Sequence, residues 1–159
     1  MAIPNPYEHD LGGRVPLEAL ADTPERIRQL VERWPDDQFE RSYAPGKWTA
    51  RQVLVHLAQI ELALGTRSRF ALTQAVYTVQ PFSQDDWIAL EDSVDAGTAL
   101  AAYVSMRRMN LAMWRTVTPE RLNRPFAHPE YGEITVAWTM AMMAGHDIHH
   151  LRQLETLRA

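Results

Sequence analysis

The sequence predicts an all-α protein built as a four-helix bundle, with short additional helical turns in the connecting loops. Apolar residues recur three and four positions apart along four long segments, as they do on the buried face of a helix. No stretch shows the alternation of apolar and polar residues that is typical of a half-buried strand. Amphipathic segments of this length bury their apolar faces by packing against one another as a bundle.

The chain has 159 residues, a length that suits one hydrophobic core. We therefore expect a single helical-bundle domain over residues 1–159, with residues 1–15 as an irregular lead-in rich in proline and glycine. The net charge is −4 and no basic stripe is visible, which argues against nucleic-acid binding. Cysteine is absent, so any thiol chemistry would need a thiol carried by the substrate.

The beginning of the chain lacks the basic and then apolar order of a signal peptide. No apolar run approaches the roughly 20 residues that a membrane span needs. The expected location is the cytoplasm, without membrane association.

Two starts compete for the first long helix. Pro16 can occupy the first turn of a helix, and apolar residues at helical spacing follow up to Val31. Within that run, Thr23 and Pro24 also form a start signal, with Thr23 as the N-cap. The helix should end before Pro35, and residues 35–47 read as a loop.

The second helix should begin at Thr49, because Gln52 follows at capping-box spacing. Its apolar stripe continues toward Phe70 and includes His56. A short helical turn is expected at residues 85–87, after Pro81.

The third helix is expected at residues 96–117, with Arg107 and Arg108 on a solvated edge. Thr118 and Pro119 can begin a single turn. We expect a loop at residues 123–133 and the last helix at residues 135–157, with its methionines filling the core.

Three of the six histidines lie within residues 146–150 of the last helix. On a helix, His150 lies about 40° round from His146, and His149 about 60° round the other way. His146 and His150 therefore point toward the apolar face, where unsatisfied imidazoles are costly. Hydrogen bonds to carbonyls or water would satisfy them. So would a divalent metal, since histidines four residues apart form a bidentate pair.

Asp147 distinguishes this pattern from the HEXXH motif of zinc proteases, which has glutamate at that place. Asp147 is expected to be a surface charge or a hydrogen-bond acceptor for a ligand. His128, in the predicted loop, is a minor ligand candidate.

Residues 45–57, with Trp48 at a helix start and His56 eight residues later, and residues 145–154 together resemble the DinB-like family of candidate four-helix-bundle metalloproteins. Its relatives include thiol-dependent transferases and maleylpyruvate isomerase. The segment 81–87 resembles the mid-chain Asp-Trp segment of the family. The resemblance covers nearly the whole chain in length, order and helix count.

In that family, one histidine of the second helix and two of the last helix bind a divalent metal. The resemblance implies these roles for His56, His146 and His150, with His149 beside the ligands or at the mouth of the site. Imidazole ligands suit Zn, Ni or Fe(II) equally.

Three imidazoles with one open position are typical of a catalytic metal site. An open position that holds water predicts a hydrolase, and one that holds a substrate thiolate predicts a thiol-dependent S-transferase or isomerase. The expected substrate is a small molecule, with a low-molecular-weight thiol as one partner. Gln153 would hydrogen-bond a ligand or substrate, or border the core. Candidates for acid–base or substrate contacts are Glu61, Tyr131, Glu133 and His149.

A non-catalytic reading stays open. In it, the metal only stabilises the bundle, and the protein acts as a dimeric binding or interaction protein. The methionines and tryptophans would fit a homodimer face as well as a core. A substrate-sized cavity beside the histidines would favour the enzyme, and a sealed site would favour the alternative.

Overall fold

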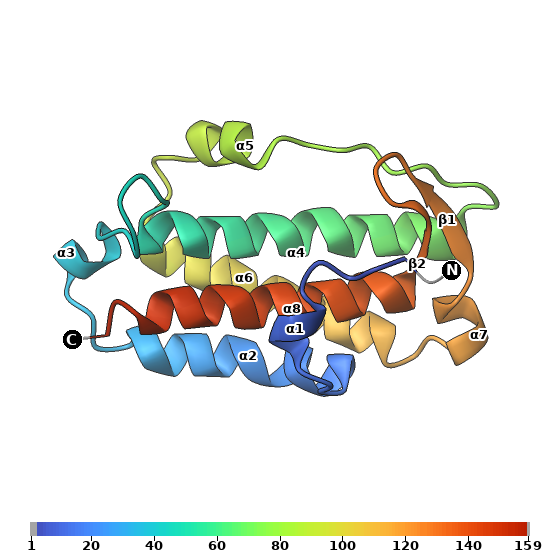
Figure 1. Cartoon of the computed structure of the whole chain (residues 1–159), viewed down its shortest axis with the longest axis horizontal. Helices are drawn as coiled ribbons and strands as arrows, with labels where there is room; N and C mark the ends of the chain where they lie inside the picture. Colours follow the sequence, from blue (N-terminus) through green and yellow to red (C-terminus); the bar gives the residue numbers. More distant parts are fainter. Residues whose placement is uncertain (1–2, 159) are drawn as a thin grey trace.

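Within residues 3–158, the part of the chain that the computed structural model describes, four long helices form a closed bundle (Figure 1). They are α2 (Pro16–Val31), α4 (Ala50–Thr73), α6 (Ala96–Trp114) and α8 (Val136–Glu155). The ring runs α2, α6, α4, α8, because each helix packs against the two on either side of it. The predicted all-α four-helix bundle is confirmed.

Short helices occupy the connections, as expected. They are α1 (Glu8–Leu11), α3 (Asp36–Phe39), α5 (Gln84–Leu90) and α7 (Pro119–Leu122). The turns near residues 85 and 119 were predicted, whereas α1 lies in the lead-in predicted to be irregular and α3 lies in a predicted loop. Residues 1–2 of that lead-in lie outside the described part of the chain. None of the helices described is both long and apolar enough to cross a membrane.

Residues 123–133 do not form the predicted loop. They contain most of an antiparallel hairpin of β1 (Pro125–His128) and β2 (Gly132–Thr135), in which Phe126 pairs with Ile134. Both of these side chains are buried, and the strands cover one end of the bundle (Figure 1). Strands of four residues with one buried position each are too short to show a period of two, so the sequence pattern missed them.

The predicted starts of α4 and α8 are confirmed, and a threonine side chain caps each of these helices. The Thr49 side chain accepts from the Gln52 N–H, and the Gln52 side chain accepts from the Thr49 N–H, which completes the capping box. Thr135 caps α8 by accepting from the Trp138 N–H at 3.0 Å. The end of α6 comes three residues earlier than expected, because the chain tightens into turn bonds between Met113 and Val117.

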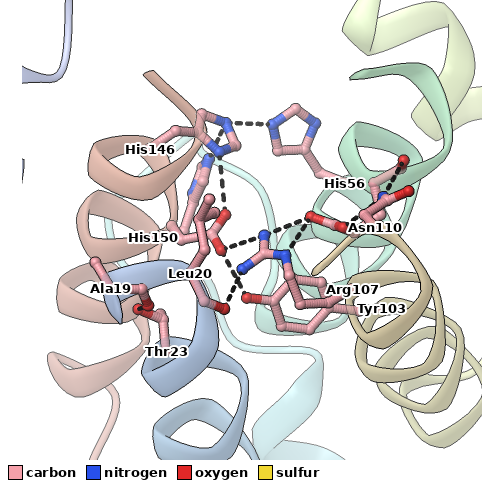
Figure 2. A network of polar contacts seen from close by, with 11 residues as sticks. Ala19, Leu20, Thr23, His56, Tyr103, Arg107, Asn110, His146 and His150 are labelled. Carbon is pink, nitrogen blue, oxygen red and sulfur yellow. Dashed lines mark hydrogen bonds and ion pairs between the residues drawn. The ribbon is translucent and has the colours of Figure 1, made fainter. Parts of the chain in front are cut away.

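Helix α2 begins at Pro16 and runs through Pro24, so the alternative start at Pro24 is wrong. Proline has no N–H, which leaves the carbonyl of Leu20, four residues earlier, without its helical partner. Arg107 Nη1 of α6 donates to that carbonyl at 2.8 Å (Figure 2). Thr23 is buried within the helix, and its hydroxyl donates to the Ala19 carbonyl at 2.8 Å. A contact from another helix thus compensates for the bond that Pro24 cannot make.

Two hydrophobic clusters fill the bundle. The cluster toward the hairpin includes Leu64, Leu111 and Met143, and the other includes Val53 and Leu154. Between them, buried polar side chains of α4, α6 and α8 cross the middle of the bundle. They are His56, Glu61, Arg107, His146, Asp147 and His150.

The segment that carries α1 packs closely on α8 at Gly145. A Cβ atom at Gly145 would overlap the carbonyl oxygen of Tyr7 and lie 2.7 Å from the Tyr7 Cβ. Trp138 Nε1 holds the same segment by donating to the Ile3 carbonyl at 3.1 Å. The absence of a side chain at Gly145 is therefore what lets the Tyr7 ring reach the polar layer.

Replacing Gly145 with alanine should lower the free energy of unfolding by about 1–3 kcal/mol, because the new methyl group overlaps backbone atoms that cannot move independently. Urea denaturation would measure the loss. Gly97→Ala is the control, since a Cβ there meets only the Asp95 carboxylate at 3.2 Å. Equal stability of the two variants would contradict the close approach of α1 to α8.

Candidate metal centre

Three histidine side chains from two helices meet in the polar layer (Figure 2). His56 Nε2 of α4 lies 2.9 Å from His146 Nε2 of α8, and His150 Nε2 lies 3.1 Å from the same atom. The side chains are buried, with exposed fractions of 1%, 3% and 6% for His56, His146 and His150. The structure thus brings together the three residues predicted as ligands, although 90 residues separate the first two.

Hydrogen bonds beyond the cluster determine the tautomer of His150. Its Nδ1 lies 2.6 Å from Gln153 Oε1, an atom that only accepts, so Nδ1 carries the hydrogen. The Nε2 lone pair of His150 therefore faces the other two histidines. Gln153 Nε2 in turn donates to His149 Nε2 at 2.9 Å, and His149 Nδ1 lies 3.4 Å from Asp10 Oδ2. Gln153 therefore hydrogen-bonds one of the predicted metal ligands, which is one of the roles expected from the sequence.

The geometry fits a bound cation. The ring nitrogens of the three histidines lie within 4.8 Å of one another, and neighbouring nitrogens around a tetrahedral zinc would lie about 3.3 Å apart. His146 Nδ1 faces Asp147 Oδ1 at 3.7 Å, which favours a hydrogen on Nδ1 and a lone pair on Nε2. His56 Nδ1 has no hydrogen-bond partner among the described residues. With its hydrogen on Nδ1, His56 would also turn an Nε2 lone pair toward the other two histidines, and a divalent cation would satisfy all three. No carboxylate or further histidine joins this group anywhere in residues 3–158.

Burial keeps two of the imidazoles, those of His56 and His150, neutral. It lowers the pKa of His56 to about 2, with His146 and His150 adding to the effect. Burial also lowers the pKa of His150 well below its ordinary value, although the Gln153 contact opposes the shift. Neutral imidazole is the form that binds metal, so at pH 7 both rings are ready to ligate.

Aromatic rings border the cluster on two sides. The Trp48 ring, just before α4, lies 4.7 Å from the His56 ring, and the Tyr7 ring meets the His146 ring edge-on at 5.1 Å. Trp48 Nε1 donates to Asp85 of α5 at 3.2 Å, which connects residues 45–57 with residues 81–87, two of the three segments that resemble the family. Sequence reasoning missed Tyr7, because nothing in the lead-in indicates that it folds back onto α8.

An ionic network lies next to the histidines (Figure 2). Arg107 donates to Glu61 of α4 through Nε at 3.0 Å and to Asp147 of α8 through Nη2 at 2.6 Å. Asn110 Nδ2 donates to Glu61 Oε2 at 2.9 Å, and the Tyr103 hydroxyl donates to Asp147 Oδ2 at 2.8 Å. These contacts hold the helices together around buried charge.

Two sequence expectations are corrected by this network. Arg107 was expected on a solvated edge together with Arg108, but it is 1% exposed and only Arg108 faces solvent. Asp147 is fully buried and is no surface charge. Burial raises the pKa of the Asp147 carboxyl, but Arg107 and His146 outweigh burial and hold that pKa below its ordinary value. The ionised Asp147 is therefore available to accept a hydrogen bond from His146.

A cavity of about 220 Å³ reaches the cluster at His146. Its lining is largely apolar and aromatic, and includes Tyr7, Leu64, Phe82, Phe126, Trp138 and Met142. Polar side chains also line it, among them Arg67, His128 and Glu130. The site is therefore not sealed, and a small molecule in this cavity would lie next to the histidines.

The other candidate residues differ in whether they line the cavity. Tyr131 lines the cavity, and His128 lines it as well, although it lies in β1 and outside the metal cluster. Glu61 is held in the ionic network, and exposed Glu133 lies in β2 outside the cavity lining. His149 lies on the outer side of Gln153 with a side chain that is 41% exposed. Of the four acid–base candidates, only Tyr131 is placed to touch a molecule in the cavity.

Known proteins resemble this chain over most of its length. The model of the DinB superfamily matches residues 19–154. YfiT of Bacillus subtilis, named as a candidate metal-dependent hydrolase, is 30% identical over 144 residues, which cover 89% of this chain and 81% of YfiT. A similarly named protein of Oceanobacillus iheyensis is 27% identical over 142 residues, which cover 89% of this chain and 83% of that protein.

Solved structures share the fold. The YfiT structure, described as having an unusual four-helix bundle topology, superposes with a TM-score of 0.83 at 29% identity, over 89% of this chain and 83% of YfiT. The mycothiol-dependent maleylpyruvate isomerase superposes with a TM-score of 0.73 over 92% of this chain and 62% of that enzyme. At 16% identity, the second likeness concerns the fold alone.

Replacing Arg107 with methionine should lower the free energy of unfolding by about 3–5 kcal/mol, because Glu61 and Asp147 would remain buried without their counter-charge. Guanidinium denaturation would measure the change. Arg108→Met removes the same charge from an exposed neighbour and should change stability by less than about 0.5 kcal/mol. Similar losses in the two variants would contradict the role of the network.

Stability should also fall with pH below about 6.5, the pKa of histidine in the unfolded chain. The unfolded chain takes up protons there, whereas buried His56 and His150 stay neutral, so each costs about 1.4 kcal/mol per pH unit. Urea unfolding of chelator-treated protein between pH 7 and 5.5 would measure the slope. His56→Gln should reduce it, whereas His9→Gln, an exposed control, should leave it unchanged. A slope unaffected by His56→Gln would disprove the assignment.

Proposed function

The chain belongs to the DinB superfamily, and on this premise we propose that it is a metal-dependent enzyme acting on a small molecule. In this proposal, His56, His146 and His150 hold a divalent metal, and the substrate binds in the cavity that His146 borders. The observation that carries the proposal is the convergence of three buried Nε2 atoms, with one of the three histidines, His146, lining that cavity. We also propose that residues 1–159 form one domain, which contains both the three histidines and the cavity.

The donor set restricts the metal without identifying it. Imidazole nitrogens suit Zn, Ni and Fe(II), and no thiolate is available in a chain without cysteine. Bound by three neutral ligands with a position open, such a metal supplies a Lewis acid that activates water or a thiol. The side chains around the site supply orientation, because Gln153 holds His150 and the carboxylate of Asp147 faces His146.

Hydrolysis is the reaction that we favour. The relatives with about 30% identity over most of their length are named as candidate metal-dependent hydrolases. Apolar and aromatic side chains dominate the cavity, so they would shield a bound substrate from bulk water and leave its reacting group at His146. The phenol groups of Tyr7 and Tyr131 lie in the same lining and can donate hydrogen bonds to the substrate.

Two alternatives to a hydrolase were also expected from the sequence, a non-catalytic bundle and a thiol-dependent enzyme. A sealed site would have favoured a non-catalytic, metal-stabilised bundle, and the cavity at His146 instead supports an enzyme. A thiol-dependent transfer or isomerisation stays a prediction, as do the cytoplasmic location and the homodimer. The thiol reaction would need a low-molecular-weight thiol as a co-substrate, since the chain provides none.

The purified protein should carry close to one equivalent of divalent metal, and a chelator should lower its melting temperature. His150→Ala should remove most of the metal, because it deletes one of three converging nitrogens, whereas His128→Ala should retain it. Elemental analysis of both variants measures the difference. Metal-free wild-type protein, or equal metal in the two variants, would disprove the assignment.

The reaction is tested with the metal-loaded protein and a panel of small esters, amides and lactones, each with and without added low-molecular-weight thiols. Thiol-independent cleavage that is lost in His150→Ala supports a hydrolase. Turnover that requires the thiol would show that the protein is a thiol-dependent transferase and not a hydrolase. A metal-loaded protein without turnover in either arm would favour the non-catalytic bundle.

A further inference from the structure

The cavity extends along the bundle from the histidine cluster toward the hairpin. On α4, His56 is followed by Ile60, Leu64 and Arg67 at helical spacing, and these last three residues line the cavity. A helix rises 1.5 Å per residue, so the Cα atoms of His56 and Arg67 are about 16 Å apart. On α8, Trp138, Met142 and His146 line the cavity, and about 12 Å of helix separates the first of these residues from the last. One end of the cavity therefore lies at the proposed metal, and the other lies at Arg67.

Arg67 is a half-buried cation without a carboxylate partner. Its Nη2 donates to the Gln80 carbonyl at 2.8 Å, and its guanidinium lies 5.3 Å from the centre of the Phe82 ring. Among residues 3–158, burial and the Tyr77 hydroxyl, and no carboxylate, influence the pKa of its guanidinium. Arg51, another half-buried arginine, has Glu40 at 2.8 Å and Asp92 at 3.3 Å. Guanidinium N–H groups of Arg67 therefore remain free to bind an anion.

His128 adds a neutral donor at the same end. Its Nδ1 accepts from the N–H groups of Glu130 and Tyr131 at 3.2 and 3.3 Å, so the ring hydrogen is on Nε2. Burial and the nearby Arg67 lower the pKa of His128, which keeps the ring neutral at pH 7. Within the described chain, Nε2 has no hydrogen-bond partner. The hairpin thus holds a fixed N–H donor beside the free guanidinium.

Glu130 is the carboxylate that lines this cavity. It lies on the exposed turn between β1 and β2, where solvent screens its charge, and it makes no ion pair with Arg67. One guanidinium and one neutral N–H match a group with a single negative charge. A dianionic phosphate would be only half compensated, so a carboxylate fits better.

We propose that the substrate is a small carboxylic acid with an apolar body. Its carboxylate binds Arg67 and the Nε2–H of His128, its body lies along Leu64 and Trp138, and its reacting group points toward His146. The position of the reacting group rests on the proposed function. The carboxylate site rests on the cavity, Arg67 and His128 alone. Figure 1 shows the hairpin beside the end of α4. Arg67 lies in the last two turns of α4, and His128 lies in β1.

The test compares two matched probes, 3-phenylpropanoate and its neutral amide, by titration calorimetry. The wild-type protein should bind the acid about tenfold more tightly than the amide, because a charge-assisted bond adds to the apolar contacts. Arg67→Gln should remove that preference and leave amide binding unchanged, and Arg67→Lys should retain part of it. Arg108→Gln, which removes an exposed charge, should behave as wild type. His128→Phe should weaken the binding of the acid alone.

Chelator-treated protein separates this proposal from the proposed function. A preference that survives metal removal and is lost in Arg67→Gln supports the carboxylate site, whatever metal the protein carries. A preference that disappears with the metal but persists in Arg67→Gln places the carboxylate at the histidines and overturns the proposal. Equal binding of acid and amide by the folded wild-type protein, or no binding of either, also overturns it.

Discussion

One guanidinium group joins all four long helices of this bundle. Arg107 of α6 donates to Glu61 of α4, to Asp147 of α8 and to the carbonyl of Leu20 in α2. In a medium of low dielectric, any of these partners left alone would be costly, so the helices can slide or rotate only by breaking several bonds together. Pro24 belongs to the same arrangement, because it withholds the N–H that would otherwise satisfy the Leu20 carbonyl. The network defines one register of the four helices.

That register positions the proposed metal centre. Asp147 adjoins His146 in α8, and Glu61 follows His56 by just over one turn in α4, so both carboxylates lie next to the histidines. Holding the carboxylates at Arg107 therefore holds the imidazoles at one height, where their Nε2 atoms meet. The apolar clusters on either side exclude water, and Tyr7 and Trp48 cover the rings. Stability and the geometry of the site thus depend on the same buried contacts.

Much of this structure follows from local rules. Thr49 and Gln52 cap α4 because capping depends on residues three positions apart, and the apolar spacing locates the long helices because each buries one face. Helical phase alone placed His146 and His150 on the inner face, and the resemblance supplied His56. The hairpin escaped prediction because its strands are too short to show a period. Arg107 and Asp147 escaped it because charged residues are usually exposed, and only their partners on other helices make burial tolerable.

The sequence by itself determined the helices, their caps and the inward pair of histidines, since each depends on neighbours within a few positions of the chain. The tertiary structure decided which distant groups meet. Arg107 finds two carboxylates and a carbonyl on three other helices, Tyr7 reaches His146 because Gly145 has no side chain, and Arg67 and His128 line one cavity. These contacts join residues far apart in the chain, so the spacing of apolar and polar residues along the sequence does not predict them. Only packing in three dimensions shows which charges are paired and which remain free to bind.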